Sequence, residues 1–194
     1  MKQPPIQITT GETTENAVER ALSSVGLTVI KPIPDVGIDF NVSLPTSDSP
    51  VVKVQVKGRG STQSNRKYRW FQIRTTPAQR KQAESSGIPL ADIWKTKVDK
   101  CDFFILVSQH HNEFWVLPKS EVIKIGIANR TKYGNRADNC SGKQSELDLD
   151  IQVNGIPLTK TYEKYCNAFK LIMDELNKRQ AEQEKCSLKN APHF

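Results

Sequence analysis

Residues 53–60, KVQVKGRG, carry two polar side chains at a spacing that suits metal-assisted chemistry. The alternation of a strand puts Gln55 and Lys57 on the face opposite Val54 and Val56. Taken alone, the pattern also fits a half-exposed strand that runs into a glycine turn. The other interpretation is half of an active site, in which Gln55 offers an oxygen ligand and Lys57 an ammonium group. The residues that precede it decide which interpretation is preferred.

An acidic residue lies on the first predicted helix, residues 11–26. Apolar residues recur at helical spacing along this segment, and Gly26 is a natural end. Glu15 stands three residues before Val18 and seven before Leu22, which predicts that it lies along the buried stripe and not on the solvent face. One alternative is that an acid in the first helical turn only favours the helix N-terminus. The other is that Glu15 points over the sheet towards a metal.

A second acid, Asp39, begins the alternating segment 37–44, GIDFNVSL, on the face opposite Ile38 and Phe40. An aspartate at this point can also be a simple edge or turn residue. If segments 37–44 and 51–57 pair as a hairpin, Asp39 converges with Gln55 and Lys57 on one face, and the valines turn to the core.

These four residues form a set with one consistent chemistry. Mg²⁺ prefers oxygen ligands, commonly one or two carboxylates together with water and phosphate. Glu15, Asp39 and Gln55 are therefore predicted metal ligands, with Mn²⁺ as an alternative metal. A metal lowers the pKa of a bound water and stabilises charge on a phosphate. Lys57, two residues beyond a ligand, can orient that water or neutralise developing charge.

The positive charge of the chain is concentrated around this set. The net charge is +7 and the isoelectric point is near 9.2. Residues 53–81 contain nine Lys or Arg and no Asp or Glu, and the rest of the chain is slightly acidic. A solvated basic face is one explanation. Because like charges repel unless a polyanion approaches, nucleic acid is the preferred partner.

The hydrophobic pattern of the whole chain predicts an α/β fold, a mixed sheet with helices packed on it. The predicted strands cover residues 27–33, 37–44, 51–57, 68–74, 101–108, 112–118 and 147–153. The predicted helices cover residues 11–26, 76–87 and 161–180, with a short helical turn at 119–126. Residues 126–146 are polar and are predicted to form a long loop. Segments 101–108 and 112–118 are expected to pair as a hairpin, with His110 and His111 in its turn.

With these residues in place, the chain resembles the PD-(D/E)XK nuclease superfamily. The resemblance rests on G-E-x-x-E-x-x-V-x-x-x-L-x-x-x-G, GIDF, VQVKG and KVDKCDFFILVSQHHNEFWVLPKSEV, and it covers residues 11–125. These motifs are similar to those of small bacterial and intron-encoded endonucleases and of archaeal Holliday-junction resolvases. The resemblance implies a restriction-endonuclease-like core, a central mixed sheet flanked by helices. It also implies a Mg²⁺-dependent endonuclease that hydrolyses phosphodiester bonds in double-stranded DNA, with restriction, homing, and junction or repair types all open. A homodimer is expected, because one such site cuts one strand.

Two positions depart from the pattern of the superfamily. Gln55 stands where most members carry an acid, so the site has one negative group fewer. Active members with Q-x-K exist, but a catalytically inactive nucleic-acid-binding module of the same fold is the alternative. An adaptor whose basic loop binds RNA or an acidic protein is a third hypothesis. Asp35 follows Pro34 and spells PD literally, which makes it the alternative to Asp39 as metal ligand.

The segment after the predicted catalytic strand supplies the candidate DNA contacts. In this superfamily such loops lie beside the DNA, where arginines, lysines and amides contact phosphates or base edges. The predicted contacts are Arg59, Gln63, Asn65, Arg66, Lys67, Arg69 and Arg74. Arg69 and Arg74 fall on opposite faces of their strand by parity. Residues 129–143 are a second candidate contact segment, or a solvated loop.

The expected organisation is a single nuclease domain over residues 1–180, followed by a polar tail over residues 181–194. Within the domain, residues 11–125 form the core, and residues 126–180 form a C-terminal loop and helix. The sequence has no long apolar run and no signal-peptide pattern, and its four cysteines show no CxxC spacing. A cytoplasmic protein with reduced thiols and no membrane association is therefore expected.

Overall fold

The computed structural model describes residues 13–33, 37–46, 48–59, 69–73, 77–133 and 146–189. Among the helices of these ranges, none combines the length and the apolar character needed to cross a membrane.

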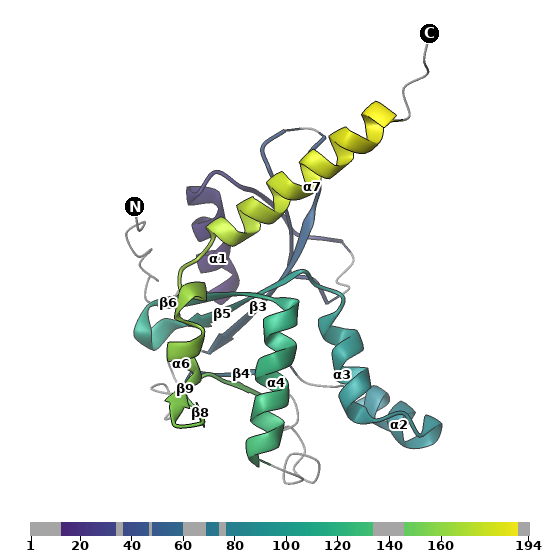
Figure 1. Ribbon diagram of the computed structural model, residues 1–194, viewed down its shortest axis with the longest axis vertical. Helices are drawn as coiled ribbons and strands as arrows, with labels where there is room; N and C mark the ends of the chain where they lie inside the picture. Colours follow the sequence, from purple (N-terminus) through teal and green to yellow (C-terminus); the bar gives the residue numbers. More distant parts are fainter. Residues whose placement is uncertain are drawn as a thin grey trace.

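A five-stranded mixed sheet forms the centre of the molecule (Figure 1). Its spatial order is β1-β2-β3-β5-β6. Strand β3 runs parallel to β5, whereas the β1–β2, β2–β3 and β5–β6 pairs are antiparallel. The bounds are β1 Thr28–Ile30, β2 Phe40–Ser43, β3 Val52–Arg59, β5 Phe103–Ser108 and β6 Glu113–Pro118. The predicted α/β class with a mixed sheet is confirmed, as are both predicted hairpins.

Helices cover the two faces of this sheet (Figure 1). Helices α1 (Thr14–Ser24) and α7 (Lys170–Lys189) lie on one side, and α3 (Leu90–Val98) and α4 (Lys119–Tyr133) on the other. Helix α2 (Pro77–Ser86) precedes α3 and packs beside it. Strand alternation divides the core in the same way, because Val54 and Val56 join the α1–α7 cluster and Phe104 and Leu106 join the α3–α4 cluster.

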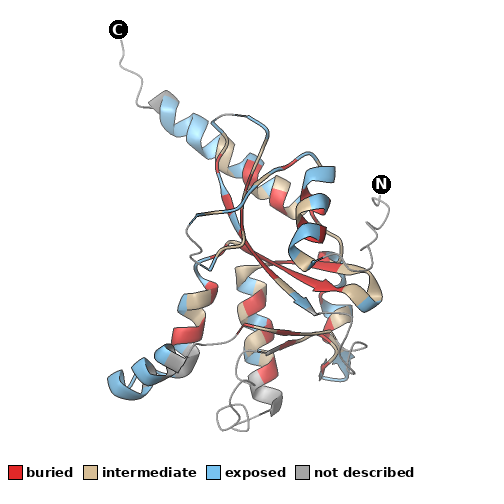
Figure 2. Ribbon diagram, turned by 180° about the vertical axis from the view of Figure 1, so that it is seen from behind, coloured by how far each residue is buried: buried red, intermediate tan, exposed pale blue. Residues whose placement is uncertain are grey.

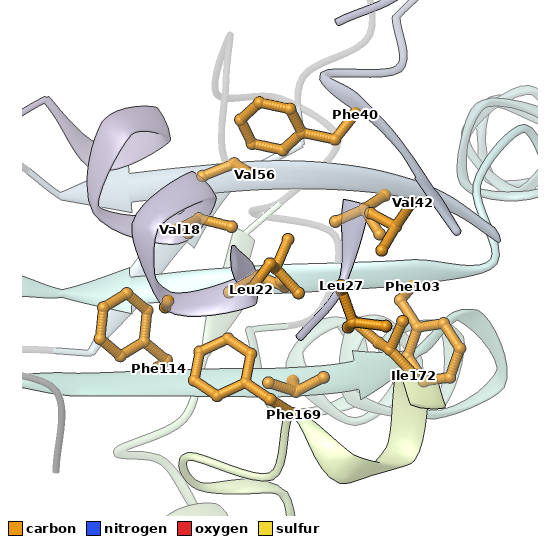
Figure 3. Close-up of a cluster of buried hydrophobic side chains, with 14 of the residues drawn as sticks. Val18, Leu22, Leu27, Phe40, Val42, Val56, Phe103, Phe114, Phe169 and Ile172 are labelled. Atoms are coloured by element: carbon orange, nitrogen blue, oxygen red, sulfur yellow. The ribbon is translucent and has the colours of Figure 1, made fainter. Parts of the chain in front are cut away.

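Helix α1 illustrates how the sequence builds the first of these clusters. The Thr13 side chain accepts the Asn16 N–H at 3.2 Å and caps the N-terminus. Four residues at helical spacing are fully buried: Ala17, Val18, Ala21 and Leu22. Figure 3 shows Val18 and Leu22 packed between the sheet residues Val42 and Val56 and the C-terminal residues Phe169 and Ile172. Gly26, at φ +85°, then ends the helical segment.

Four further strands form two separate two-stranded sheets. Strand β4 (Trp70–Gln72) pairs with β7 (Glu146–Asp148), and β8 (Gln152–Val153) pairs with β9 (Ile156–Pro157). A 3-10 turn, η1 (Gln109–His111), joins β5 to β6 and contains the two histidines, as predicted. Figure 2 shows that the buried residues concentrate in the sheet and on the helix faces that cover it.

The structure differs from the sequence expectation in its helices. Helix α3 was not predicted. Helix α4 continues to Tyr133 instead of forming a short turn, so the part of the predicted loop up to residue 133 is helical. Asn129 explains this extension, because its amide is buried against the Ile125 carbonyl and the backbone of Asp148 in β7. The tertiary contact holds a polar segment in the helix.

The helix predicted over residues 161–180 is divided by a strand-like contact. Asn167 adopts φ 56°, its backbone N–H donates to Phe114 O at 2.6 Å, and its side chain accepts the Phe114 N–H at 3.0 Å. The chain therefore forms α6 (Leu158–Thr161) and η3 (Glu163–Tyr165) before α7 starts. Helix α7 then continues to Lys189, into the segment predicted as a polar tail.

Candidate active site

The β2–β3 hairpin places Asp39 beside the centre of β3. Phe40 pairs with Val54, and the Asp39 N–H donates to the Val54 carbonyl at 3.0 Å. The Asp39 carboxylate accepts the Val56 N–H through Oδ2 at 2.6 Å. This bond ties the carboxylate to the strand segment that carries Gln55, and within the described residues Oδ1 accepts no hydrogen bond. The hairpin thus fixes Oδ2 of Asp39 through the Val56 N–H, and Oδ1 can bind a ligand.

Gln55 is the most unusual residue of this strand. It pairs in register with Phe104, a member of the α3–α4 cluster, and therefore points to the α3–α4 face. The residue is only 5% exposed, and within the part of the chain that the structure describes Oε1 has no hydrogen-bond partner. A buried acceptor without a partner costs about 1–3 kcal/mol and calls for an explanation such as a water or an ion.

Lys57 lies two residues beyond Gln55 on the same face. It pairs in register with Leu106, as Gln55 pairs with Phe104, and it is half-buried. Gly58 follows at the point where the first turn of α1 meets β3. A Cβ at position 58 would lie 2.0 Å from Thr14 Cγ2, so only glycine fits this approach. The close contact positions the beginning of α1 against the strand end that carries Lys57.

Glu15 is not where the sequence pattern predicted it to be. The prediction of a position on the buried stripe is wrong, because the Glu15 side chain is 50% exposed and lies 3.9 Å from Lys31 Nζ. Lys31 also lies 3.7 Å from Glu19, so the two acids form a row beside the buried face of α1. Since α1 covers the opposite face of the sheet, Glu15 can approach Gln55 and Lys57 only around the end of β3.

Cys101 is a buried residue of this site that sequence reasoning missed. It is 1% exposed, and its thiol lies 3.7 Å from the Gly37 carbonyl, two residues before Asp39. Burial raises the pKa of the Cys101 thiol to about 11, and the negative charge of Asp39 adds to this effect. The thiol therefore stays protonated near pH 7 and serves as an apolar neighbour of the carboxylate.

Lys97 is a second residue that was missed, because helix α3 was missed. Burial lowers the pKa of Lys97, and the positive charges of Lys57 and Lys100 lower it further. Helix α3 therefore places Lys97 where the charge of Lys57 acts on it. A signal for α3 was present in the sequence: Leu90, Ile93, Trp94 and Val98 recur at helical spacing.

Most of the predicted DNA contacts lie outside the described residues. This holds for Gln63, Asn65, Arg66, Lys67 and Arg74, and also for Asp35, the alternative to Asp39. Arg59 ends β3, where its backbone pairs with Ser108, but its side chain is likewise outside the described part. The assignments of these residues stay predictions.

Arg69 has an intramolecular role that the sequence did not indicate. Its guanidinium donates to both Glu113 carboxylate oxygens, at 2.7 and 2.8 Å, and to Asp150 at 3.1 Å. Its backbone N–H also donates to Asp150 at 2.6 Å. The hydrogen bonds to Glu113 raise the pKa of Arg69 above its ordinary value. This network joins the start of β4 to β6 and competes with the predicted DNA contact of Arg69.

The donor set suits a hard cation better than a soft one. Asp39 and Gln55 both offer oxygen, and Mg²⁺ binds through one or two carboxylates together with water and phosphate. Among the described residues, no group of three His, Cys, Asp or Glu side chains gathers around one point. A metal held here would therefore depend on few protein ligands, of which the buried Gln55 oxygen is the least satisfied by the protein itself.

Comparisons with known proteins complete the description of the site. No protein-family model and no curated protein matches the chain. Among solved structures, the chain is similar to the bacterial homing endonuclease I-Ssp6803I, at 18% sequence identity and a TM-score of 0.46. The match covers 86% of this chain and 89% of that chain. At this identity and TM-score the similarity does not support a functional inference. The functional conclusion therefore rests on the residues of the chain itself.

Proposed function

We propose that the chain is a Mg²⁺-dependent endonuclease of the PD-(D/E)XK type, which hydrolyses phosphodiester bonds in double-stranded DNA. The observation that carries the proposal is the buried Oε1 of Gln55, which has no hydrogen-bond partner among the described residues and lies on the face shared with Lys57. A buried amide oxygen without a hydrogen bond is unfavourable, so its retention favours a bound ligand. A hard cation is the ligand that suits an amide oxygen beside a carboxylate.

Each residue of the set has a distinct role in this proposal. Asp39 and Gln55 hold the metal, and Glu15 is a third ligand if its side chain turns from Lys31 around the end of β3. Mg²⁺, or Mn²⁺ in its place, lowers the pKa of a bound water and stabilises charge on a phosphate. The Lys57 ammonium orients the attacking water and neutralises charge that develops on the phosphate.

The basic segment supplies the attraction for DNA in this proposal. Residues 53–81 carry nine positive and no negative side chains, a distribution that favours a polyanionic partner. Arginines and lysines there would contact backbone phosphates and set the position of the duplex. The proposed contacts are Arg59, Gln63, Asn65, Arg66, Lys67 and Arg74.

One observation favours the alternative of a catalytically inactive nucleic-acid-binding module. Gln55 brings no charge, and the described residues assemble no group of three potential metal-binding acids, thiols or imidazoles. A module of this kind would bind DNA through the same basic segment and would leave the phosphodiester backbone intact.

Plasmid cleavage separates the two functions. Supercoiled plasmid is incubated with wild-type protein and with Lys57→Ala, in Mg²⁺ and in EDTA. We expect nicking by the wild type only in Mg²⁺, and a rate lower by about 10²–10⁴-fold in Lys57→Ala, the contribution of a positioned proton-transfer group. Lys95→Ala is the matched control, since the Lys95 side chain is 45% exposed on α3 and is paired with Asp92 at 3.0 Å. Plasmid binding without nicking by the wild type would establish the inactive module.

The same assay tests the proposed homodimer. A single site cuts one strand, so a monomer yields open circles that become linear only after a second encounter, whereas a dimer yields linear DNA directly. Sedimentation velocity at the protein concentration of the assay gives the mass independently. A monomer mass together with direct linearisation would contradict this arrangement.

A further inference from the structure

The proposed metal site combines one carboxylate with one neutral amide. The peptide N–H between Gln55 and Val56 donates to Asp39 Oδ2 at 2.6 Å, so the carboxylate lies one peptide unit from Gln55. The Asp39 N–H donates to the Val54 carbonyl at 3.0 Å, which holds the backbone on the other side of Gln55. Gln55 is 5% exposed, and its Oε1 has no hydrogen-bond partner among the described residues. A cation held by these two side chains would meet a single negative charge.

The other charged residues of the predicted set add no attraction for a divalent cation. Lys57 follows Gln55 by two residues on the same strand face, roughly 7 Å further along the strand, and brings a positive charge. Glu15 is 50% exposed and lies 3.9 Å from Lys31, so its carboxylate already has a cationic partner. Within the described part of the chain, no three His, Cys, Asp or Glu side chains gather around one point. The charges of Asp39 and Lys57 therefore offset each other before a metal binds.

A DNA phosphate would supply the negative charge that this site lacks. Mg²⁺ is commonly bound through one or two carboxylates together with water and phosphates of the substrate. A phosphate beside Lys57 would offset the ammonium group and would offer the cation another anionic oxygen. The cation and the DNA would then each raise the affinity of the protein for the other, because coupling between two ligands is reciprocal. An acid at position 55 would instead let the free protein attract the cation by itself.

We propose that Gln55 makes metal binding depend on DNA: the cation binds weakly to the free protein and tightly only when a phosphate of the DNA completes the site. The proposal rests on the proposed function for the identity of the phosphate. It gives the amide at position 55 a role of its own, since an uncharged oxygen suits a cation that binds together with its substrate. The free protein then holds little metal, and the metal and the DNA occupy the site together.

The first test measures DNA affinity against Ca²⁺ concentration, with Ca²⁺ in place of Mg²⁺ so that cleavage does not interfere. Fluorescence anisotropy on a labelled duplex gives the affinity at constant ionic strength. Competition of cations for the phosphates makes added Ca²⁺ weaken DNA binding. We expect the opposite sign for the wild type, a gain in affinity of about 10-fold, which lies in the usual range of coupling between two ligands. Gln55→Met should show only the weakening, and the control Lys95→Ala should match the wild type.

The second test is a calorimetric titration of Ca²⁺ into the protein without DNA. We expect weak binding to the wild type and binding at least about 10-fold tighter to Gln55→Glu, whose carboxylate adds a second negative charge. Lys57→Met should also bind Ca²⁺ more tightly than the wild type, because the opposing ammonium group is gone. Thermal melts identify any variant that fails to fold. Gln55→Met is close to glutamine in shape and keeps the first test decisive if Gln55→Glu does not fold.

Two outcomes would overturn the proposal. Equal Ca²⁺ affinity of the wild type with and without the duplex would show that metal binding does not depend on DNA. A gain in DNA affinity that is the same in the wild type and in Gln55→Met would place the coupled cation elsewhere, and a water would then be the partner of the Gln55 oxygen.

The outcome is independent of the cleavage assay. A wild type that nicks plasmid in Mg²⁺, but whose DNA affinity only falls as Ca²⁺ is added, retains the endonuclease function and overturns the coupling. A wild type that binds DNA more tightly in Ca²⁺ through Gln55, but does not nick plasmid in Mg²⁺, supports the coupling and overturns the endonuclease function.

Discussion

At Gln55, the fold leaves a buried polar atom without a partner in a strand that is otherwise well paired. The residue is 5% exposed, and its amide oxygen makes no hydrogen bond to any described residue. A buried polar atom without a hydrogen bond calls for an explanation, such as a catalytic role or a bound water or ion, because the cost of removing it from water is not otherwise compensated. The stability of the protein without metal is therefore the most direct probe of this residue.

Replacement of Gln55 by Met is predicted to stabilise the metal-free protein. Methionine has nearly the same shape, so the change removes an unpaired polar group without opening a cavity. We expect the free energy of unfolding in EDTA to rise by about 1–3 kcal/mol, as measured by urea denaturation. Adding Mg²⁺ is expected to raise the melting temperature of the wild type and to leave that of Gln55→Met unchanged. An equal Mg²⁺ effect on both proteins would exclude Gln55 as a ligand.

Among the elements, helix α7 holds the start of β3 and β5 in place. Arg179 donates to Asp102 at 2.8 Å, to the Val51 carbonyl at 2.8 Å and to Glu175 at 2.8 Å. Asp102 in turn accepts the Lys53 N–H at 2.8 Å. Two strands and a helix that are far apart in the sequence thus meet at one carboxylate, at the end of β3 away from Lys57.

Arg179→Met is predicted to destabilise the fold in a pH-dependent manner. Burial opposes the ionisation of Asp102, but the hydrogen bonds from Arg179 and from the Lys53 N–H outweigh it and lower the pKa of the carboxyl. Such a carboxyl stabilises the fold above its unfolded pKa and loses that contribution as the pH falls through its folded pKa. We expect a loss of about 1–3 kcal/mol near pH 7.

Stability measurements at acid pH test whether Arg179 acts through the Asp102 carboxylate. As the pH falls below about 4, the ordinary pKa of an aspartate, the difference between wild type and Arg179→Met should shrink. Urea denaturation at several pH values measures it, with Lys178→Met, an exposed neighbour on α7, as the control. A difference that stays constant down to strong acid would mean that Arg179 acts through packing and not through Asp102.

The whole molecule consists of one sheet with an apolar cluster on each face, and α7 extends beyond it. Figure 1 shows the C-terminal half of α7 projecting away from the sheet, and residues 181–187 are exposed. Because α7 contacts the body through Ile172, Leu176 and Arg179, the segment after residue 180 adds little buried surface. The expected domain boundary near residue 180 stays a prediction that truncation can test.

Removal of residues 181–194 is predicted to leave the fold intact. The truncated chain keeps Arg179 and both clusters, so its free energy of unfolding should match that of the full chain within about 0.5 kcal/mol, the usual range for exposed positions. Urea denaturation and sedimentation velocity together measure the effect. A loss of stability that depends on protein concentration, accompanied by a lower mass, would place the proposed dimer contact on this segment.

The sequence by itself determined what depends on neighbours along the chain. Helical spacing predicted α1, and alternation predicted β2 and β3. An apolar run predicted β5 with β6 as its hairpin partner, and strand parity put Gln55 and Lys57 on one face. These features are local, because side-chain direction in a strand or helix follows from the backbone repeat.

Only the tertiary structure decided which faces meet and which charges are already paired. It placed α1 over the face of the sheet that carries Val54 and Val56. Glu15 lies outside the buried stripe of this helix, 3.9 Å from Lys31. The tertiary structure also engaged Arg69 with Glu113 and Asp150, and it left the Gln55 oxygen without a hydrogen-bond partner among the described residues. Each of these outcomes depends on packing between segments distant in the sequence, which no spacing along one segment specifies.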